Sequence, residues 1–384
     1  MCTSKESHTT RLKHSTFTAN KQIEEVYGEN SVFKSRVNSS LVEVYTALGT
    51  LHKNKAYDSA MENVEIAIKQ YGEHSVFCLS YFMSGMSANV QRGTHAIAEN
   101  ILGKMLRVLE HSGEITNGNQ YFFLASVLLG VVCCHANQFE QAHLFFTGTM
   151  KKQLKYVGDE PDHPFLEQTY MHMAVMYKNI QNLASGKFSS NSCDIATIMF
   201  KNLLAIHKRV YGESSYTLAA DYKNIGTCQI GIGQANESIE SLVNAEKYSK
   251  IALSELDDES EVKDEQKQLC EIYFSQYLAY VSLSEWDKAL KANNESLKLN
   301  IQILGENDLN TANNYYLGAQ IYFKKLAIED AMDYASKANA IIDSKPLKEP
   351  LLLVRYRFLR AKLYKLKENN IEALKDLNTA LVVC

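Results

Sequence analysis

The chain contains few of the residues that interrupt helices or mark disulfide-stabilised proteins. Proline occurs only 4 times in 384 residues, and tryptophan occurs once. Because proline disrupts helix interiors, so few prolines favour a largely helical fold. The 8 cysteines form no CxxC pair, and no segment resembles a signal peptide. We therefore expect reduced thiols, most of them in the core, in a reducing compartment.

Excess charge of one sign and long hydrophobic runs are also lacking. The formal net charge is −4, so no overall field favours nucleic acid or an acidic membrane surface. The longest apolar run, Phe122 to Cys134, is too short to cross a bilayer. These absences predict a cytoplasmic protein with no nucleic-acid partner and no membrane insertion. Residues 1–20 are polar and are expected to form an N-terminal tail.

Against these absences, the chain contains a recurring joint between predicted helices. The tripeptide Tyr-Gly-Glu occurs at residues 27–29, 71–73 and 211–213, with variants at 157–160 and 304–307. Each joint follows one helical apolar pattern and precedes another. Glycine suits a helix C-terminus that needs a left-handed backbone. The polar residues that follow in three joints suit the N-cap of the next helix, and these are Ser75, Ser214 and Asp308.

Between the joints, the pattern predicts pairs of antiparallel helices, which we call helix A and helix B. Each helix B has a small residue near its start, where close packing against helix A requires it. These residues recur about every 42 positions, with insertions near 181–192 and 254–265. We predict an all-α, right-handed superhelical solenoid of about eight helix pairs over residues 21–384. The small residues are Ala60, Ala98, Ala142, Ala196, Ser238, Ala289, Ala331 and Ala373.

This pattern resembles the tetratricopeptide repeat family, in the 42-residue form of kinesin light chains. The joints at 157–164 and 304–308 are similar to the Leu-Gly-x-x-His-Pro joint of that family. The family's paired helix A asparagines are only partly echoed, by Asn224 and by Asn313-Asn314, and the coiled-coil segment of kinesin light chains is missing. A weaker likeness, to axonemal dynein-associated proteins with such repeats, rests on residues 71–76 and the helix pairs up to Tyr211.

The resemblance implies a concave wall lined by the first helix of each pair, where another protein would bind. Such a wall is extended and largely preformed, so binding costs little ordering. We predict that the binding residues come from the helix A face opposite the small packing residue. They are Lys223, Asn224, Thr227, Asn313, Tyr316, Gln320, Arg355, Phe358, Lys362 and Lys365.

Two charged segments allow a structural or a functional interpretation. Residues 345–367 contain eight basic residues and one acidic residue, Glu349. They form either a solvated helix face or a site for an acidic partner, because arginine pairs bidentately with carboxylates. Residues 254–265 contain seven acidic residues opposed by Lys263. They form either a solvated loop or helix end, or a docking loop for a basic partner.

Three further features suggest chemistry but have simpler explanations. Cys133-Cys134-His135 lies on a predicted helix without a second ligand group nearby, so a zinc site is not expected. Gly231-Ile232-Gly233 follows a helix rather than a strand, which argues against a dinucleotide loop. His163 is expected to cap or occupy a joint. With no catalytic motif in the sequence, we expect no enzymatic activity, cofactor or metal.

Two functional hypotheses remain. The chain is either a non-enzymatic scaffold or adaptor within a larger assembly, with a cytoskeletal or ciliary axonemal assembly favoured, or a soluble cargo or chaperone adaptor that binds short peptides transiently. A chaperone adaptor of the family spreads a basic carboxylate clamp over three repeats. Here the basic residues gather in one terminal repeat, which argues against the second hypothesis.

Overall fold

The computed structural model describes residue 26 and residues 31–47, 53–111, 120–182, 191–345 and 350–383. These residues form 16 α-helices and two short 3-10 helices, with no strand among them. They divide into two compact units, Met1–Met176 and Tyr177–Cys384, which are treated separately below. The predicted tail, 1–20, and most of the first insertion lie outside the described residues.

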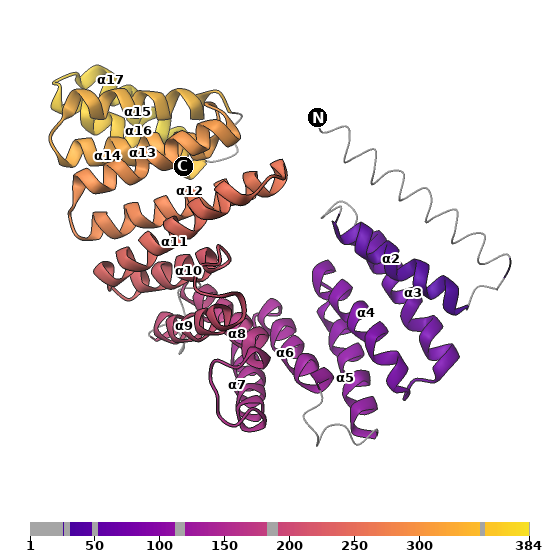
Figure 1. Ribbon diagram of the computed structural model, residues 1–384. Coiled ribbons are helices and arrows are strands. Elements are labelled where there is room, and N and C mark those ends of the chain that lie inside the picture. The colour runs from indigo at the N-terminus through magenta and orange to yellow at the C-terminus, as the bar shows by residue number, and fades with distance from the viewer. Residues whose placement is uncertain are drawn as a thin grey trace. The chain divides into compact units, whose positions relative to one another are not determined.

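The first unit contains three helix pairs, each packed against the next along the chain (Figure 1). A 3-10 turn precedes the first helix of two pairs: η2 (Val76–Cys78) leads into α4, and η4 (Pro164–Leu166) leads into α8. The pairs are α2 (Val32–Ala47) with α3 (Lys53–Tyr71), α4 (Leu79–Arg92) with α5 (His95–His111), and α6 (Gln120–His135) with α7 (Phe139–Tyr156). The unit boundary falls inside α8 (Glu167–Asn182).

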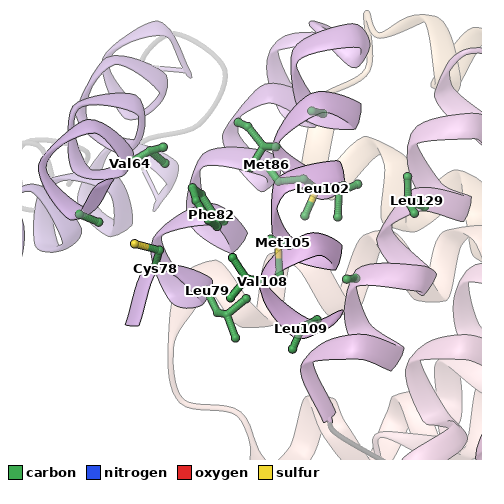
Figure 2. Close-up of a cluster of buried hydrophobic side chains, with 14 of the residues drawn as sticks. Val64, Cys78, Leu79, Phe82, Met86, Leu102, Met105, Val108, Leu109 and Leu129 are labelled. Atoms are coloured by element: carbon green, nitrogen blue, oxygen red, sulfur yellow. The ribbon is translucent and has the colours of Figure 1, made fainter. Parts of the chain in front are cut away.

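The core of the first unit is built by α3, α4, α5 and α6 (Figure 2). Phe82 and Met86 on α4 face Leu102 and Met105 on α5, and all four side chains are 0% exposed. Leu129 on α6 joins the same cluster. Complete burial of such large apolar groups contributes roughly 1.5–3 kcal/mol each to folding, so this cluster holds successive pairs of the unit together.

The second unit continues the alternation of A and B helices (Figure 1). Helix α12 has 24 residues, compared with 14 in α10 and 16 in α14. The helices after α8 are α9 (Ser192–Tyr211), α10 (Leu218–Gly231), α11 (Ala235–Glu255), α12 (Glu259–Ser282), α13 (Trp286–Leu304), α14 (Leu309–Lys324), α15 (Ile328–Asp343), α16 (Pro350–Leu366) and α17 (Asn370–Val383).

The eight small residues lie near the starts of the eight B helices, as predicted. Seven are 0% exposed, and the last, Ala373, is 7% exposed. Their burial permits close approach of each A helix. At one contact, the Ser238 hydroxyl donates to the Gly226 carbonyl at 2.7 Å. A Cβ added to Gly226 would lie 2.6 Å from Leu242. The repeat prediction is therefore confirmed at the level of side-chain packing.

The turns inside the pairs share one backbone conformation that the sequence did not reveal. In six pairs a residue with positive φ lies five positions before the small residue of helix B. Two turns use glycine, whereas the others place side chains in this left-handed region. These turn residues are Gly93, Asn137, Gly233, Ser284, Leu326 and Glu368.

The joints between pairs use glycine as predicted, with positive φ at Gly72, Gly158, Gly212 and Gly305. At Gly212 φ is 87° and ψ is 159°, which is an extended backbone of positive φ that glycine alone adopts readily. Ser75 and Asp308 accept the expected capping hydrogen bonds. The prediction for Ser214 is wrong. Its neighbour Ser215 accepts the bond from the Thr217 amide at 3.3 Å instead. Ser215 lies three residues after the joint glycine, Gly212, as Ser75 and Asp308 do after theirs.

The second insertion lengthens two helices rather than forming a long loop. Helix α11 continues to Glu255, and α12 begins at Glu259. Asp258 caps α12 by accepting from the Ser260 and Glu261 amides at 2.9 and 3.2 Å. Its carboxylate also suits the positive N-terminal end of the helix dipole. The acidic stretch is thus a helix end.

No described helix combines the length and the apolar character needed to cross a membrane.

Candidate functional site on the A helices of the second unit

All ten predicted binding residues lie on A helices of the second unit. Lys223, Asn224 and Thr227 are on α10, and Asn313, Tyr316 and Gln320 are on α14. Arg355, Phe358, Lys362 and Lys365 are on α16. We call the surface formed by α10, α12, α14 and α16 the A-helix face. That these residues bind a partner stays a prediction.

On α10, two of the three predicted side chains connect neighbouring A helices. Lys223 Nζ lies 2.7 Å from Glu271 Oε2 on α12. Lys178 Nζ on α8 donates to Asn224 Oδ1 at 2.8 Å. Burial lowers the pKa of Lys178, because removing an ammonium from water disfavours its charged form. Thr227 instead donates to the Lys223 carbonyl of its own helix at 2.8 Å. These contacts hold adjacent A helices in register.

On α14, Tyr316 is enclosed by residues of the next A helix. Its ring stacks on Tyr356 with centroids 4.8 Å apart. The Arg355 guanidinium carbon lies 5.8 Å from the same ring, and Gln320 Nε2 donates to the Tyr316 hydroxyl at 2.8 Å. Tyr316 is consequently only 7% exposed. It closes the gap between α14 and α16, so it offers little surface to a partner.

On α16, an exposed aromatic ring lies among basic side chains. Phe358 is 49% exposed, and Lys362 Nζ lies 4.4 Å from its ring centre, close enough for a cation–π contact. Arg355, Lys362 and Lys365 are exposed. None of these three forms an ion pair with a described carboxylate. They stay available to an acidic group.

The other arginines of α16 have a structural role. Arg360 holds Asp376 on α17 through two hydrogen bonds, at 2.7 and 2.6 Å. Arg357 contacts Asp376 at 2.8 Å and Asp343 at 2.5 Å. The Asp376 side chain is only 4% exposed. The basic residues of α16 therefore separate into Arg357 and Arg360, which hold α16 to α17, and Arg355, Lys362 and Lys365, which pair with no described carboxylate; Lys367, just after the helix, pairs with Glu329 on α15 at 2.8 Å.

Sequence reasoning missed the contribution of α12. Phe274 lies 42 residues before Tyr316, which itself lies 42 residues before Phe358. Phe274 is 39% exposed, and Leu278, one turn later, is 38% exposed. The 42-residue repeat length could have identified Phe274, because the three rings occupy equivalent positions on successive A helices. The acidic insertion before α12 obscured this alignment.

Beside Phe274, a cavity of about 400 Å³ lies between α12, α13 and α14. Its polar wall is made mainly of asparagine side chains. Asn300 Nδ2 donates to Asn314 Oδ1 at 2.6 Å, and Asn314 Nδ2 donates to Asn293 Oδ1 at 3.2 Å. Asn313, one of the predicted residues, also lines the cavity. Carboxamides supply both donors and acceptors, so this wall suits a neutral polar ligand group.

Two carboxylates of the acidic segment 254–265 have partners on α11 or α12 of the same unit. Asp264 pairs with Lys267 at 2.6 Å. Glu265 Oε1 accepts from Ser249 at 2.6 Å and from Gln268 at 3.0 Å. These bonds favour the solvated helix end that the sequence allowed. None of these three bonds involves a basic side chain from another helix.

The other candidate sites have local structural roles. His163 Nδ1 accepts from the Phe165 amide at 3.2 Å, which confirms the capping interpretation. Gly233 lies in the turn between α10 and α11 with φ 79°. Within the described ranges, no group of three or more His, Cys, Asp or Glu side chains is placed to hold a metal ion. Cys133 is buried at the end of α6, and burial raises the pKa of its thiol.

Comparison with known proteins identifies the architecture. No family model and no curated protein sequence matches the chain. Among solved structures, a signal-transduction ATPase with a tetratricopeptide repeat sensor from Pyrococcus horikoshii aligns at 14% identity and a TM-score of 0.53. The alignment covers 92% of this chain and 52% of the ATPase.

Two further structures align less closely. Kinesin-light-chain-type repeats from Podosopora anserina match at 13% identity and a TM-score of 0.46, covering 58% of this chain and 97% of theirs. NprR in complex with its cognate peptide NprX matches at 16% identity and a TM-score of 0.40, covering 93% of this chain and 88% of NprR. Helix pairing, buried small residues and the alignment with the repeat sensor together give the chain the tetratricopeptide repeat fold.

Proposed function

We propose that the chain is a non-enzymatic scaffold that binds a segment of another protein along its A-helix face. The rings of Phe274 and Phe358, which occupy equivalent positions of their repeats, carry this proposal. Phe274 is 39% exposed and Phe358 is 49% exposed, on helices whose other faces are buried. Exposed aromatic rings on a preformed surface are the usual anchors of protein interfaces. Stacked helix pairs present such rings without an ordering cost.

The α16 end of the A-helix face is proposed to receive an acidic part of the partner. Arg355, Lys362 and Lys365 occupy about 15 Å of one helix at a rise of roughly 1.5 Å per residue. They have no described carboxylate partner, whereas Arg357 and Arg360 do. Paired arginines would gain little from a second acidic group. The unpaired cations would steer and orient an acidic segment.

The scaffold is proposed to act within a larger assembly, in the cytoplasm and attached to the cytoskeleton or a ciliary axoneme. Support for this setting comes from the sequence resemblance to dynein-associated repeat proteins. Transient binding of cargo or chaperone peptides is the alternative. The unpaired cations of α16 belong to one repeat, whereas a clamp for a peptide carboxylate draws on several, so the fixed assembly is favoured.

Site-specific photo-cross-linking in the native cell tests the proposal. The photo-reactive p-benzoylphenylalanine replaces Phe358 or Phe274 in the full-length chain. Matched controls replace Ile198 on α9 and Val243 on α11, B-helix residues that are 53% and 49% exposed. We expect the same protein to be captured from both A-helix positions and from neither control. Capture that is equal at all four positions, or absent from the A helices, would contradict the proposal.

A charge-reversal series tests the acidic partner separately. Arg355→Glu and Lys362→Glu together should reduce capture from position 358 by roughly tenfold, because attraction becomes repulsion at a partly desolvated surface. Lys337→Glu on α15 is the control, since this lysine already pairs with Asp333 on its own helix. Equal capture by the double variant and the control would rule out an acidic segment at α16.

A further inference from the structure

Successive A helices of the second unit do not pack in the same way, although their sequences align at 42-residue spacing. Between α14 and α16, the ring of Tyr356 stacks on Tyr316 and is itself 1% exposed. Between α12 and α14, the residue equivalent to Tyr316 is Phe274, and the residue equivalent to Tyr356 is Asn314. A carboxamide therefore stands where the next repeat supplies a ring.

The cavity lies at the place where that ring is missing. Phe274 and Asn314 both line it, and Phe274 is 39% exposed whereas Tyr316 is 7% exposed. Asn314 cannot reach across as a tyrosine would, and its amide is bonded to Asn293 and Asn300. At about 400 Å³ the cavity is within the range of sites that bind small organic groups.

We infer that this cavity receives an aromatic side chain of a bound protein segment, which stacks on Phe274 as Tyr356 stacks on Tyr316. The inference rests on the proposed function, because the A-helix face would present the segment. The incoming ring would take the position between α12 and α14 that Tyr356 takes between α14 and α16, in addition to the contact that Phe274 makes with Tyr277 of its own helix, with ring centroids 6.2 Å apart. Stacking in an offset or tilted arrangement stabilises such a pair beyond its buried area.

The lining of the cavity selects a neutral ring, and tyrosine over phenylalanine. The charged groups at its rim are already paired: Glu271 with Lys223 at 2.7 Å, and Lys267 with Asp264 at 2.6 Å. A charged ligand would therefore meet no unpaired opposite charge among the lining residues. Asn300 uses its Nδ2 to bond Asn314, and no hydrogen bond among the described residues uses its oxygen or the Asn313 side chain. Both can therefore bind a phenol hydroxyl, which would otherwise lose its hydrogen bond to water.

The inference is tested with N-acetyl-L-tyrosinamide as the probe, titrated into the full-length protein by ligand-observed NMR. We expect millimolar binding, with N-acetyl-L-leucinamide at least tenfold weaker, since it cannot stack. Phe274→Leu should weaken tyrosinamide binding about tenfold, and Asn314→Tyr should abolish it by filling the cavity from within. Tyr216→Leu is the control, because Tyr216 is equally exposed, at 39%, and lies outside the cavity.

The control measurements and the results that would overturn the inference are as follows. Circular dichroism establishes that the variants are folded; if Asn314→Tyr is not, Phe274→Leu carries the test alone. Equal binding of leucinamide and tyrosinamide, or unchanged binding by Phe274→Leu, overturns the inference. Absence of probe binding together with photo-capture from Phe358 overturns the cavity inference and leaves the scaffold. Probe binding without any A-helix capture overturns the scaffold and leaves the cavity.

Discussion

Leu326 shows how the repeat geometry overrides the preference of a single residue. Its backbone has φ 60°, and its side chain is 79% exposed. A left-handed conformation costs an L-residue roughly 1–2 kcal/mol, and an exposed leucine gains little in return. The turn between α14 and α15 imposes this conformation, as the turn does at the equivalent position of five other pairs.

We therefore expect Leu326→Gly to raise the free energy of unfolding by about 1 kcal/mol. Urea unfolding followed by circular dichroism measures it. Leu144→Gly is the control, because Leu144 is 68% exposed but lies inside α7. There, glycine should lower the free energy of unfolding by about 1 kcal/mol. Destabilisation by both substitutions would mean that the turn does not impose the strained conformation.

His172, on the part of α8 that belongs to the first unit, gives that unit a pH dependence. Burial, with a smaller contribution from His135, holds the pKa of His172 below its ordinary value of 6.5. Above that value the histidine is neutral in both states. As the pH falls below it, the unfolded chain takes up a proton that the folded chain does not, so folding weakens until the folded pKa is reached.

Replacing His172 with glutamine should flatten this dependence. The drop in melting temperature between about pH 7 and pH 5 should be smaller in His172→Gln than in the unaltered protein. His143→Gln on α7 provides a comparison histidine in the same unit. The explanation fails if the two variants lose the same stability over this interval.

At the scale of the element, one buried carboxylate, that of Asp376, joins α17 to two arginines of α16. Asp376→Asn would leave Arg357 and Arg360 without their shared counter-ion at a site that is largely excluded from water. Breaking a buried pair in this way costs roughly 3–5 kcal/mol. Hydrogen exchange should then show loss of protection in α16 and α17.

Asp333→Asn on α15 is the matched control, since its pair with Lys337 is exposed on both sides. Exposed pairs contribute about 0–1 kcal/mol, so protection of α15 should stay near that of the unaltered chain. Similar losses from the two substitutions would show that the arginine cluster does not secure the last pair.

The elements themselves could be predicted because their signals are local. The small residue near the start of each B helix, from Ala60 to Ala373, recurs in sequence for the same reason that it is buried in the structure. The sequence does not show which basic residues of α16 pair with a carboxylate and which do not. Arg357 and Arg355 are two residues apart, yet one pairs with Asp376 and the other does not, and that difference depends on where α17 packs.

The cavity also lay beyond sequence reasoning. Asn313 and Asn314 partly match a family pattern in the sequence, but a missing ring becomes visible only when Phe274, Tyr316 and Tyr356 are placed in space. Alignment at 42 residues would have brought Phe274 into the predicted site. It would not have shown the empty volume beside it, because volume depends on the packing of three helices.

For the molecule as a whole, we expect partners to bind to the A helices and not to the B helices. The most direct test compares two double variants of the tagged full-length protein in its native cell. One is Phe274→Ala with Phe358→Ala on the A-helix face; the other is Ile198→Ala with Val243→Ala on the B helices. Quantitative mass spectrometry of the purified material measures the stoichiometry of each co-purified protein.

Both double variants remove exposed apolar groups, so both should stay folded, which thermal unfolding verifies. We expect stoichiometric partners to be lost, by roughly tenfold or more, from the A-helix variant and to be retained by the B-helix variant. Retention of all partners by the folded A-helix variant, or an equal loss from both variants, would contradict it.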